Sequence, residues 1–180
     1  MKAVITSLVV AIILALILSL PALGKESGTI TITMTGVNEI SISLDKTQWP
    51  LGNVASDTEY TTSPPIEWCT LNITGNCNVN TFIVGEDAKW VDNPSAYKWT
   101  LSNDGTNGEN VYGLQFRISG DTSRGYVPVT KIEGEFWPYA GDSSLAPGDT
   151  KQFGLKLLTP TYFIGDRQVQ TQITISAVAA

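Results

Sequence analysis

Apolar and polar residues alternate with a period of two along much of this chain, and that alternation most narrowly limits the folds open to it. In the clearest case, Ile30, Ile32 and Met34 are separated by threonines. No stretch has the three- and four-residue spacing of a long amphipathic helix. Because successive side chains of a strand point to opposite faces, the pattern predicts half-buried strands of antiparallel sheets, and therefore an all-β protein.

The alternation recurs between clusters of turn-forming residues. Further alternating or apolar stretches cover 40–44, 67–73, 79–84, 97–101, 112–118, 129–137, 153–157 and 169–175. Clusters of Gly, Asn, Asp and Pro separate many of them, at 72–76, 103–110, 120–125 and 141–149. This spacing predicts about nine or ten strands in one antiparallel, jelly-roll-like β-sandwich over residues 37–180.

The first 24 residues have a different character. Lys2 precedes an apolar run from Ala3 to Leu20, and small residues, Ala22 and Gly24, follow Pro21. This order is typical of a secretory signal peptide over residues 1–24, cleaved after Gly24. A membrane anchor is the alternative, since the run is near the lower length limit for crossing a bilayer. We expect a secreted, extracellular protein with no stable membrane insertion after cleavage.

Composition argues against several classes of function. The chain has 11 basic and 17 acidic residues, a net charge of −6, which disfavours nucleic acid as a partner. It has no histidine, so serine triads, Cys–His pairs and histidine-based metalloprotease sites are absent. Glu133 and Glu135, beside Trp137, could form a glycosidase pair, although the solvent face of a strand explains them more simply. We expect neither enzymatic activity nor a cofactor.

Two further patterns have a functional and a structural interpretation. Residues 103–110 are rich in oxygen ligands but lack the ligand spacing of an EF-hand, and a solvated turn accounts for them. Five tryptophans could form a sugar-stacking platform or serve as core residues of a sandwich. They are Trp49, Trp68, Trp90, Trp99 and Trp137. A secreted carbohydrate-binding or other cell-surface β-sandwich module therefore remains the alternative function.

The chain has two cysteines, Cys69 and Cys77, on either side of a turn-forming Thr74-Gly75-Asn76. Outside the cytoplasm, such a pair predicts a disulfide, here across the two strands of a hairpin. A zinc site is disfavoured because two thiols without histidine do not make a ligand set. Asn72-Ile73-Thr74 also matches the acceptor pattern for N-glycosylation, which places a possible glycan on Asn72 at the same tip.

The segment after the expected cleavage site, 25–35, is the most suggestive element. It is rich in threonine, free of proline, and followed by Gly36. In one interpretation it is an ordinary first strand that pairs with 40–44. In the other it is a donor strand, which leaves its own sandwich and completes the sheet of a neighbouring subunit, with Gly36 as the hinge. The donor strand would comprise Thr29, Ile30, Thr31, Ile32, Thr33, Met34 and Thr35.

The order of these features resembles the secreted β-sandwich fibre proteins of the TasA type, including archaeal bundling-pilus subunits. The resemblance covers most of the chain after residue 24, but only as a pattern. Its motifs are the Asn72-Ile73-Thr74-Gly75-Asn76 turn before Val79 and the Leu145-Ala146-Pro147-Gly148-Asp149 segment before an alternating strand. It implies that the N-terminal strand, Thr29 to Thr35, inserts into an adjacent subunit. The cysteine pair is not a general mark of that family.

From these observations we expect three regions: a signal peptide over 1–24, a donor strand and hinge over 25–36, and one β-sandwich domain over 37–180. The expected function is that of a structural subunit of an extracellular filament, or pilus, assembled by donor-strand complementation. It would serve adhesion, bundling or biofilm matrix formation. The expected partners are identical subunits, with filaments of the same kind or cell-surface components as possible further ones.

Overall fold

The computed structural model describes residues 30–96, 98–121, 123–138, 143–164 and 167–180. The chain divides into two units, Met1–Gly36 and Val37–Ala180. The described part is all-β and contains no helix, so none that could cross a membrane; the expected signal peptide, 1–24, lies outside it. The strands are β1 (Ile42–Leu44), β2 (Glu59–Thr61), β3 (Cys69–Ile73), β4 (Val79–Gly85), β5 (Ala88–Trp90), β6 (Lys98–Leu101), β7 (Val111–Ile118), β8 (Val127–Pro128), β9 (Gly134–Trp137), β10 (Thr150–Leu158), β11 (Val169–Gln170) and β12 (Ile173–Ala179).

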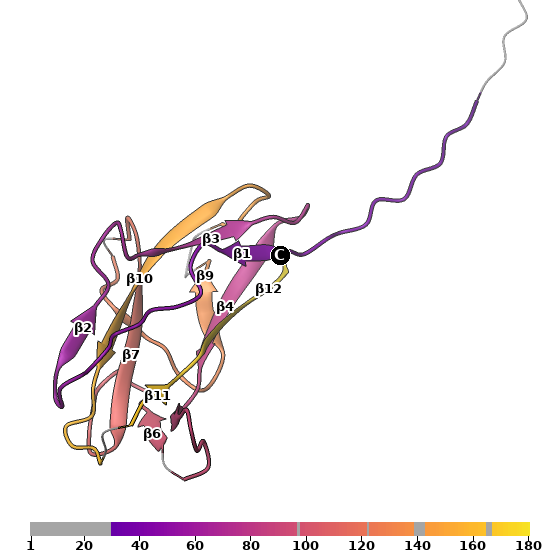
Figure 1. Ribbon diagram of the computed structural model, residues 1–180. Coiled ribbons are helices and arrows are strands. Elements are labelled where there is room, and N and C mark those ends of the chain that lie inside the picture. The colour runs from indigo at the N-terminus through magenta and orange to yellow at the C-terminus, as the bar shows by residue number, and fades with distance from the viewer. Residues whose placement is uncertain (1–29, 97, 122, 139–142, 165–166) are drawn as a thin grey trace, which may run out of the picture. The chain divides into compact units, whose positions relative to one another are not determined.

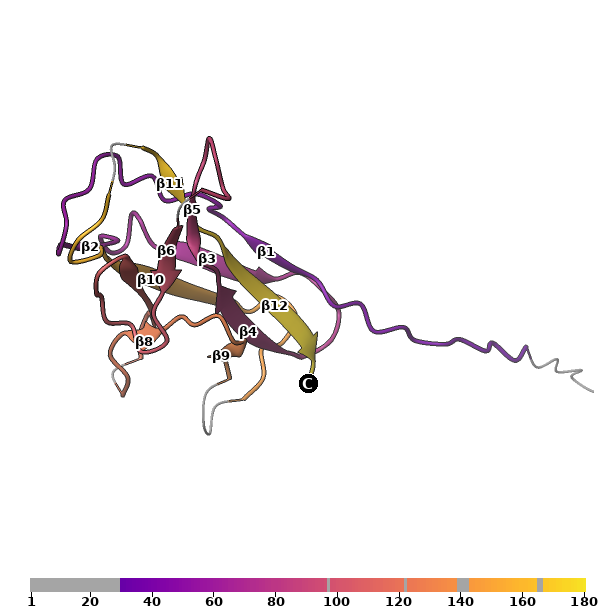
Figure 2. The same ribbon diagram turned by 90° about the horizontal axis from the view of Figure 1, so that it is seen from below.

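The second unit is a sandwich of two sheets, shown in Figure 1 and, from below, in Figure 2. The larger sheet has the strand order β1-β3-β10-β7-β6-β5-β11, with β2 also paired to β10 and β8 to β7. The smaller sheet has the order β12-β4-β9. Alternation on the facing strands produces the core: Val79, Thr81 and Ile83 of β4 are buried, while the residues between them are only half-buried. The expected all-β sandwich is confirmed.

One strand pair departs from the expected antiparallel arrangement. β6 and β7 run parallel, with Thr100 opposite Val111 and Leu101 opposite Tyr112. Their connection therefore has to return to the end from which β6 started, and it packs against β7 on the way. Gly113 permits this, because a Cβ there would lie 2.2 Å from the carbonyl oxygen of Gly105. The larger sheet is therefore mixed. The close approach of the β6–β7 loop to Gly113 makes room for the parallel pair.

Two stretches expected to be single strands are shortened or interrupted in the structure. The stretch 129–137 contributes only β9, after β8 has ended in the other sheet. Between them, the Thr130 hydroxyl donates to the Ile132 carbonyl at 2.7 Å and accepts from the Ile132 amide at 3.2 Å, which forms a tight turn. The stretch 169–175 likewise divides into β11 and β12. The alternation of Val169, Thr171, Ile173 and Ile175 continues through the second crossing, so it could not reveal that crossing.

The carboxylate of Asp87 joins three parts of the sandwich beside β5. It accepts hydrogen bonds from the Leu101 amide at 2.9 Å and from Lys98 Nζ at 3.0 Å, and Lys131 Nζ lies 3.2 Å away. Burial pushes the pKa of Asp87 upward, but these three partners outweigh it and hold the pKa below its usual value of 3.8. The ionised form is therefore the one that stabilises the fold.

We expect Asp87→Asn to lower the free energy of unfolding at pH 7 by about 1–3 kcal/mol, the cost of removing a half-buried carboxylate that accepts charged and backbone hydrogen bonds. Because the folded pKa is depressed, the wild-type advantage is present above pH 3.8 and is lost as the pH falls through the lower folded value. Urea unfolding at pH 7 and below pH 3 measures this difference. Asp92→Asn is the surface control, since the Asp92–Arg167 pair is exposed. A difference that persists at low pH would contradict the assignment.

Candidate assembly interface

Strand β12 forms one edge of the smaller sheet and has a hydrogen-bonded neighbour on one side only. It pairs with β4 along its whole length, from Ile173 opposite Gly85 to Ala179 opposite Val79. Within the described residues, no backbone hydrogen bond leaves its other side. Alternate residues along these seven therefore present unpaired amides and carbonyls on the side away from β4, a surface that an additional extended segment can pair with.

The inward side chains of β12 are incompletely covered. Ile175 lies opposite Ile83, which is 2% exposed, and both point toward the core. Ile173, Ile175 and Ala177 nevertheless remain half-buried, although they pack against the core cluster. A residue at the margin of a core is left in this state when the next strand of its sheet is absent. The edge of β12 is thus both unpaired and apolar.

The larger sheet ends in the same way on the adjacent side. β1 pairs only with β3, with Ile42 opposite Ile73 and Leu44 opposite Leu71. The β3 residues are 2% and 0% exposed, whereas Ile42 and Leu44 are half-buried. Figures 1 and 2 show β1 and β12 on the same side of the sandwich. We call this margin, formed by β1 and β12, the acceptor edge.

The expected donor segment is described from Ile30 onward, while Thr29 lies outside the described residues. Ile30, Ile32 and Met34 are 87%, 74% and 85% exposed. Residues 30–36 belong to no strand and make no backbone hydrogen bond to another described residue. The alternative interpretation, a hairpin with 40–44, stays a prediction as well. Gly36 has open space around its Cβ position and is the last residue of the first unit; its hinge role stays a prediction.

The structure contradicts the expected Cys69–Cys77 disulfide, because both cysteines are free. β3 and β4 lie in different sheets and form no hairpin. Cys69 begins β3 at one end, whereas Cys77 Sγ donates to the Glu39 carbonyl at 3.6 Å, beyond the other end. At ~3.3 Å per residue, β3 alone separates these ends by ~13 Å, well beyond the ~7 Å limit between the Cα atoms of a disulfide.

The possible glycosylation site lies on a strand rather than at a turn. Asn72 is in β3, between Ser43 of β1 and Thr150 of β10. Its neighbours Leu71 and Ile73 are buried, so Asn72 points to the outer face of the larger sheet and is half-buried. Glycosylation of Asn72 stays a prediction, and a glycan there would lie on the outer face of the larger sheet.

The tryptophans do not form an exposed row. Trp99 is 6% exposed and packs against Phe163, with ring centroids 4.8 Å apart. The other four are half-buried, and Trp49 and Trp137 pack against the core. A sugar-stacking platform needs coplanar exposed rings. The structure therefore gives the alternative carbohydrate-binding function no support from these residues.

The acidic candidates are engaged in local structure. Glu133 Oε1 accepts from the Ser176 hydroxyl at 2.5 Å, and both Glu133 and Glu135 are exposed. In the 103–110 loop, hydrogen bonds from Ser102 and Thr106 lower the pKa of Asp104 to about 2. The Asp104 carboxylate therefore stabilises the turn that contains it. Among the described residues no cluster of three metal-binding side chains occurs.

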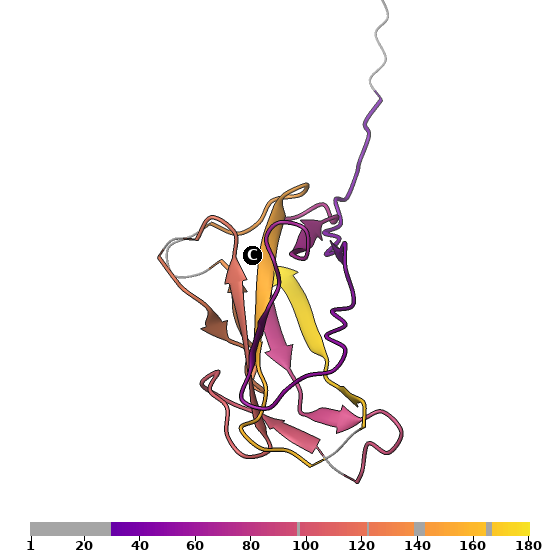
Figure 3. The ribbon, with the colours of Figure 1, turned by 60° about the vertical axis from the view of Figure 1, so that its left-hand side comes forward.

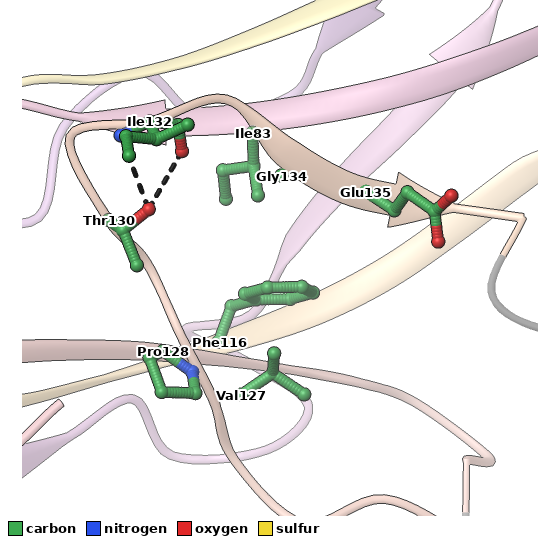
Figure 4. A pocket seen from close by; sticks show the side chains of 8 residues that line it. All are labelled: Ile83, Phe116, Val127, Pro128, Thr130, Ile132, Gly134 and Glu135. Carbon is green, nitrogen blue, oxygen red and sulfur yellow. Dashed lines mark hydrogen bonds between the residues drawn. The ribbon is translucent and has the colours of Figure 1, made fainter. Parts of the chain in front are cut away.

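An apolar pocket of about 200 Å³ opens on the β8–β9 side of the sandwich. In Figure 4, Ile83 lies across the opening from Phe116, Val127 and Pro128, while Thr130 and Ile132 line one side. Glu135 is its one acidic lining residue and provides no facing carboxylate. This arrangement lacks the paired acids or polar anchors of a catalytic site.

No family model matches this chain, and no curated protein matches it significantly. The acceptor edge is the arrangement with the clearest chemistry: an unpaired strand backed by half-buried apolar residues. Sequence reasoning identified a candidate donor but not this edge. The alternation of Ile173 and Ile175 was visible, but nothing in it showed that the strand would lack a second neighbour.

Proposed function

We propose that this protein is a structural subunit of an extracellular filament and that it assembles by donor-strand complementation between identical copies. Residues 29–35 of one subunit would pair with the free side of β12 in the next. The observation that carries the proposal is the acceptor edge, where core side chains stay half-buried beside an unpaired strand. Signal-like residues 1–24 support the extracellular location, and the TasA-type pattern supports a role in adhesion, bundling or matrix formation.

The two surfaces match in length and pattern. β12 has seven residues, and Thr29 to Thr35 is a segment of equal length. In a strand, Ile30, Ile32 and Met34 would share one face and could cover the half-buried residues of β12 and β1. The intervening threonines would face solvent, as residues on the outer side of a half-buried sheet do.

The energetic balance favours such pairing. Burying three large apolar side chains contributes roughly 2 kcal/mol each, and each new ladder hydrogen bond adds about 1 kcal/mol. Association costs at least about 4 kcal/mol in lost translational and rotational freedom. Seven paired residues can therefore yield a stable joint. The same contacts repeat head to tail, and a heterologous contact of this kind produces an open filament.

Ile32→Asp is expected to abolish filament formation, because it would place a carboxylate in the apolar gap without a partner. Thr31→Asp is the matched control: it adds the same charge one residue away, on the face that points to solvent, and should still assemble. Negative-stain microscopy and sedimentation of the secreted protein measure both. Normal filaments from Ile32→Asp, or equal loss in both variants, would contradict the proposal.

A further inference from the structure

The middle of the segment between β1 and β2 has a backbone without hydrogen-bonded partners among the described residues. Residues 47–54 form no helix or strand, and none of their backbone groups bonds to another described residue. Pro50 and Gly52, the latter at φ +66°, interrupt any regular conformation. We call residues 47–54 the cover segment.

Three half-buried apolar side chains hold the cover segment. Trp49, Leu51 and Val54 all pack against the core cluster, while Pro50, Gly52 and Asn53 are exposed. Without ladder hydrogen bonds, these side-chain contacts are what keeps the segment on the sandwich. A segment with few buried contacts and a solvated backbone lies at the low end of local stability.

Both ends of the cover segment are fixed. At one end, the Asp45 carboxylate accepts from the Thr70 amide at 2.6 Å, and Lys46 Nζ donates to the carbonyls of Ile66 and Trp68. At the other, the Ala55 amide donates to the Tyr60 hydroxyl at 2.9 Å, and the Asp57 amide to the Pro160 carbonyl at 2.9 Å. The middle can therefore leave the core while the anchors remain in place.

The cover segment runs alongside the free side of β12. Figure 3 shows the order β4, β12 and then the indigo segment that follows β1. Figure 2, from below, likewise shows β12 between β4 and the indigo segment. It thus lies where the next strand of the smaller sheet would be, without making that strand's hydrogen bonds.

We propose that the cover segment occupies the acceptor edge in the free subunit and is displaced when the donor strand of another copy enters. This inference rests on the proposed function and adds a regulatory step to it. The cover supplies three apolar contacts and no ladder; the donor supplies three apolar contacts and a ladder. The exchange is therefore favourable, yet the core of a free subunit is protected until a donor arrives.

A displaceable cover lowers the apparent affinity for the donor by the fraction of subunits that are open. Weakening the cover should strengthen donor binding. If the segment instead forms a fixed wall of the groove, weakening it should reduce binding. The two possibilities predict opposite signs for the same substitutions.

The test uses the full chain carrying Ile32→Asp, which cannot act as a donor, and a synthetic peptide of residues 25–36. Binding is followed by calorimetry and by tryptophan fluorescence. We expect the peptide to shift the emission to longer wavelength as Trp49 leaves the core, and the shift to be absent in the Trp49→Phe chain. In the chain that also carries Leu51→Ala and Val54→Ala, the peptide should bind about tenfold tighter. Ile132→Ala, at a 78% exposed position away from this margin, is the control and should leave affinity unchanged.

The outcomes separate the two proposals. Peptide binding with unchanged Trp49 emission, or with equal or weaker affinity in the Leu51→Ala, Val54→Ala chain, overturns the displaceable cover and leaves donor-strand assembly standing. Absence of peptide binding in every chain overturns the proposed function as well. Far-ultraviolet circular dichroism of each variant verifies that the sandwich is folded.

Discussion

A chain carrying Ile175→Asp is expected to be secreted and folded but to form no filaments. Ile175 is the central inward residue of β12, half-buried and opposite Ile83 on β4. A carboxylate there can still reach solvent in the free subunit because Ile175 is only half-buried and no described strand pairs with the free side of β12. An incoming strand would cover the charge and leave it unpaired, which costs several kcal/mol and exceeds the gain from any one ladder contact.

The control is Thr174→Asp, one residue away on the exposed outer face of β12. It should assemble as the wild type does. Sedimentation and negative-stain microscopy report assembly, and urea unfolding reports the integrity of each subunit. Filaments of normal length from a folded Ile175→Asp chain would show that β12 is not the acceptor.

The largest effect on stability is expected from Phe136→Ala. Phe136 is fully buried on β9 and contacts two rings of the opposite sheet. Its centroid lies 5.2 Å from that of Phe116 and 5.1 Å from that of Phe153, the second in an edge-on arrangement. Truncation removes this link between the sheets and leaves a cavity, at a cost of about 3–5 kcal/mol.

Since domains of this size are stable by only about 5–15 kcal/mol, the Phe136→Ala chain should unfold at much lower urea concentration. Ile66→Ala, at an 83% exposed position, serves as the control and should change the free energy of unfolding little. A loss below ~1 kcal/mol for Phe136→Ala would mean that the two sheets do not depend on this aromatic contact.

The strands that the sequence predicted best are those whose pattern is both long and local. The expected strand at 112–118 is β7 (Val111–Ile118), and 79–84 is β4 (Val79–Gly85). In β7 the apolar residues alternate, so a period of two suffices to find it. The stretch 79–84 was predicted from its apolar character instead, and its buried face includes Thr81. The core residues of β7 follow from the same pattern.

What the sequence could not show was which strands become neighbours. The expected hairpin around Cys69 and Cys77 does not form, because β3 and β4 lie in different sheets. β3 pairs with the distant strand β10, and β4 pairs with the distant strand β12. The parallel β6–β7 pair depends on the fit of the 102–110 loop against Gly113. Alternation carries no information about either, since it is the same for any neighbour.

For the same reason, the sequence predicted the donor segment of the candidate site but not the acceptor edge. The exposed alternation of Ile30, Ile32 and Met34 is a property of one segment and can be read locally. The acceptor edge is a property of the whole sandwich, because it exists only where β12 has one neighbour instead of two. No stretch of sequence records a missing neighbour.

One mixing experiment tests donor-strand assembly most directly. The Ile32→Asp chain keeps its acceptor edge, and the Ile175→Asp chain keeps its donor strand; each alone should be monomeric by light scattering. Mixed in equal amounts, they should form a one-to-one dimer that grows no further, since the free donor and free acceptor at its ends are both disabled. A mixture that stays monomeric while both chains are folded, or one that forms long filaments, would contradict the account.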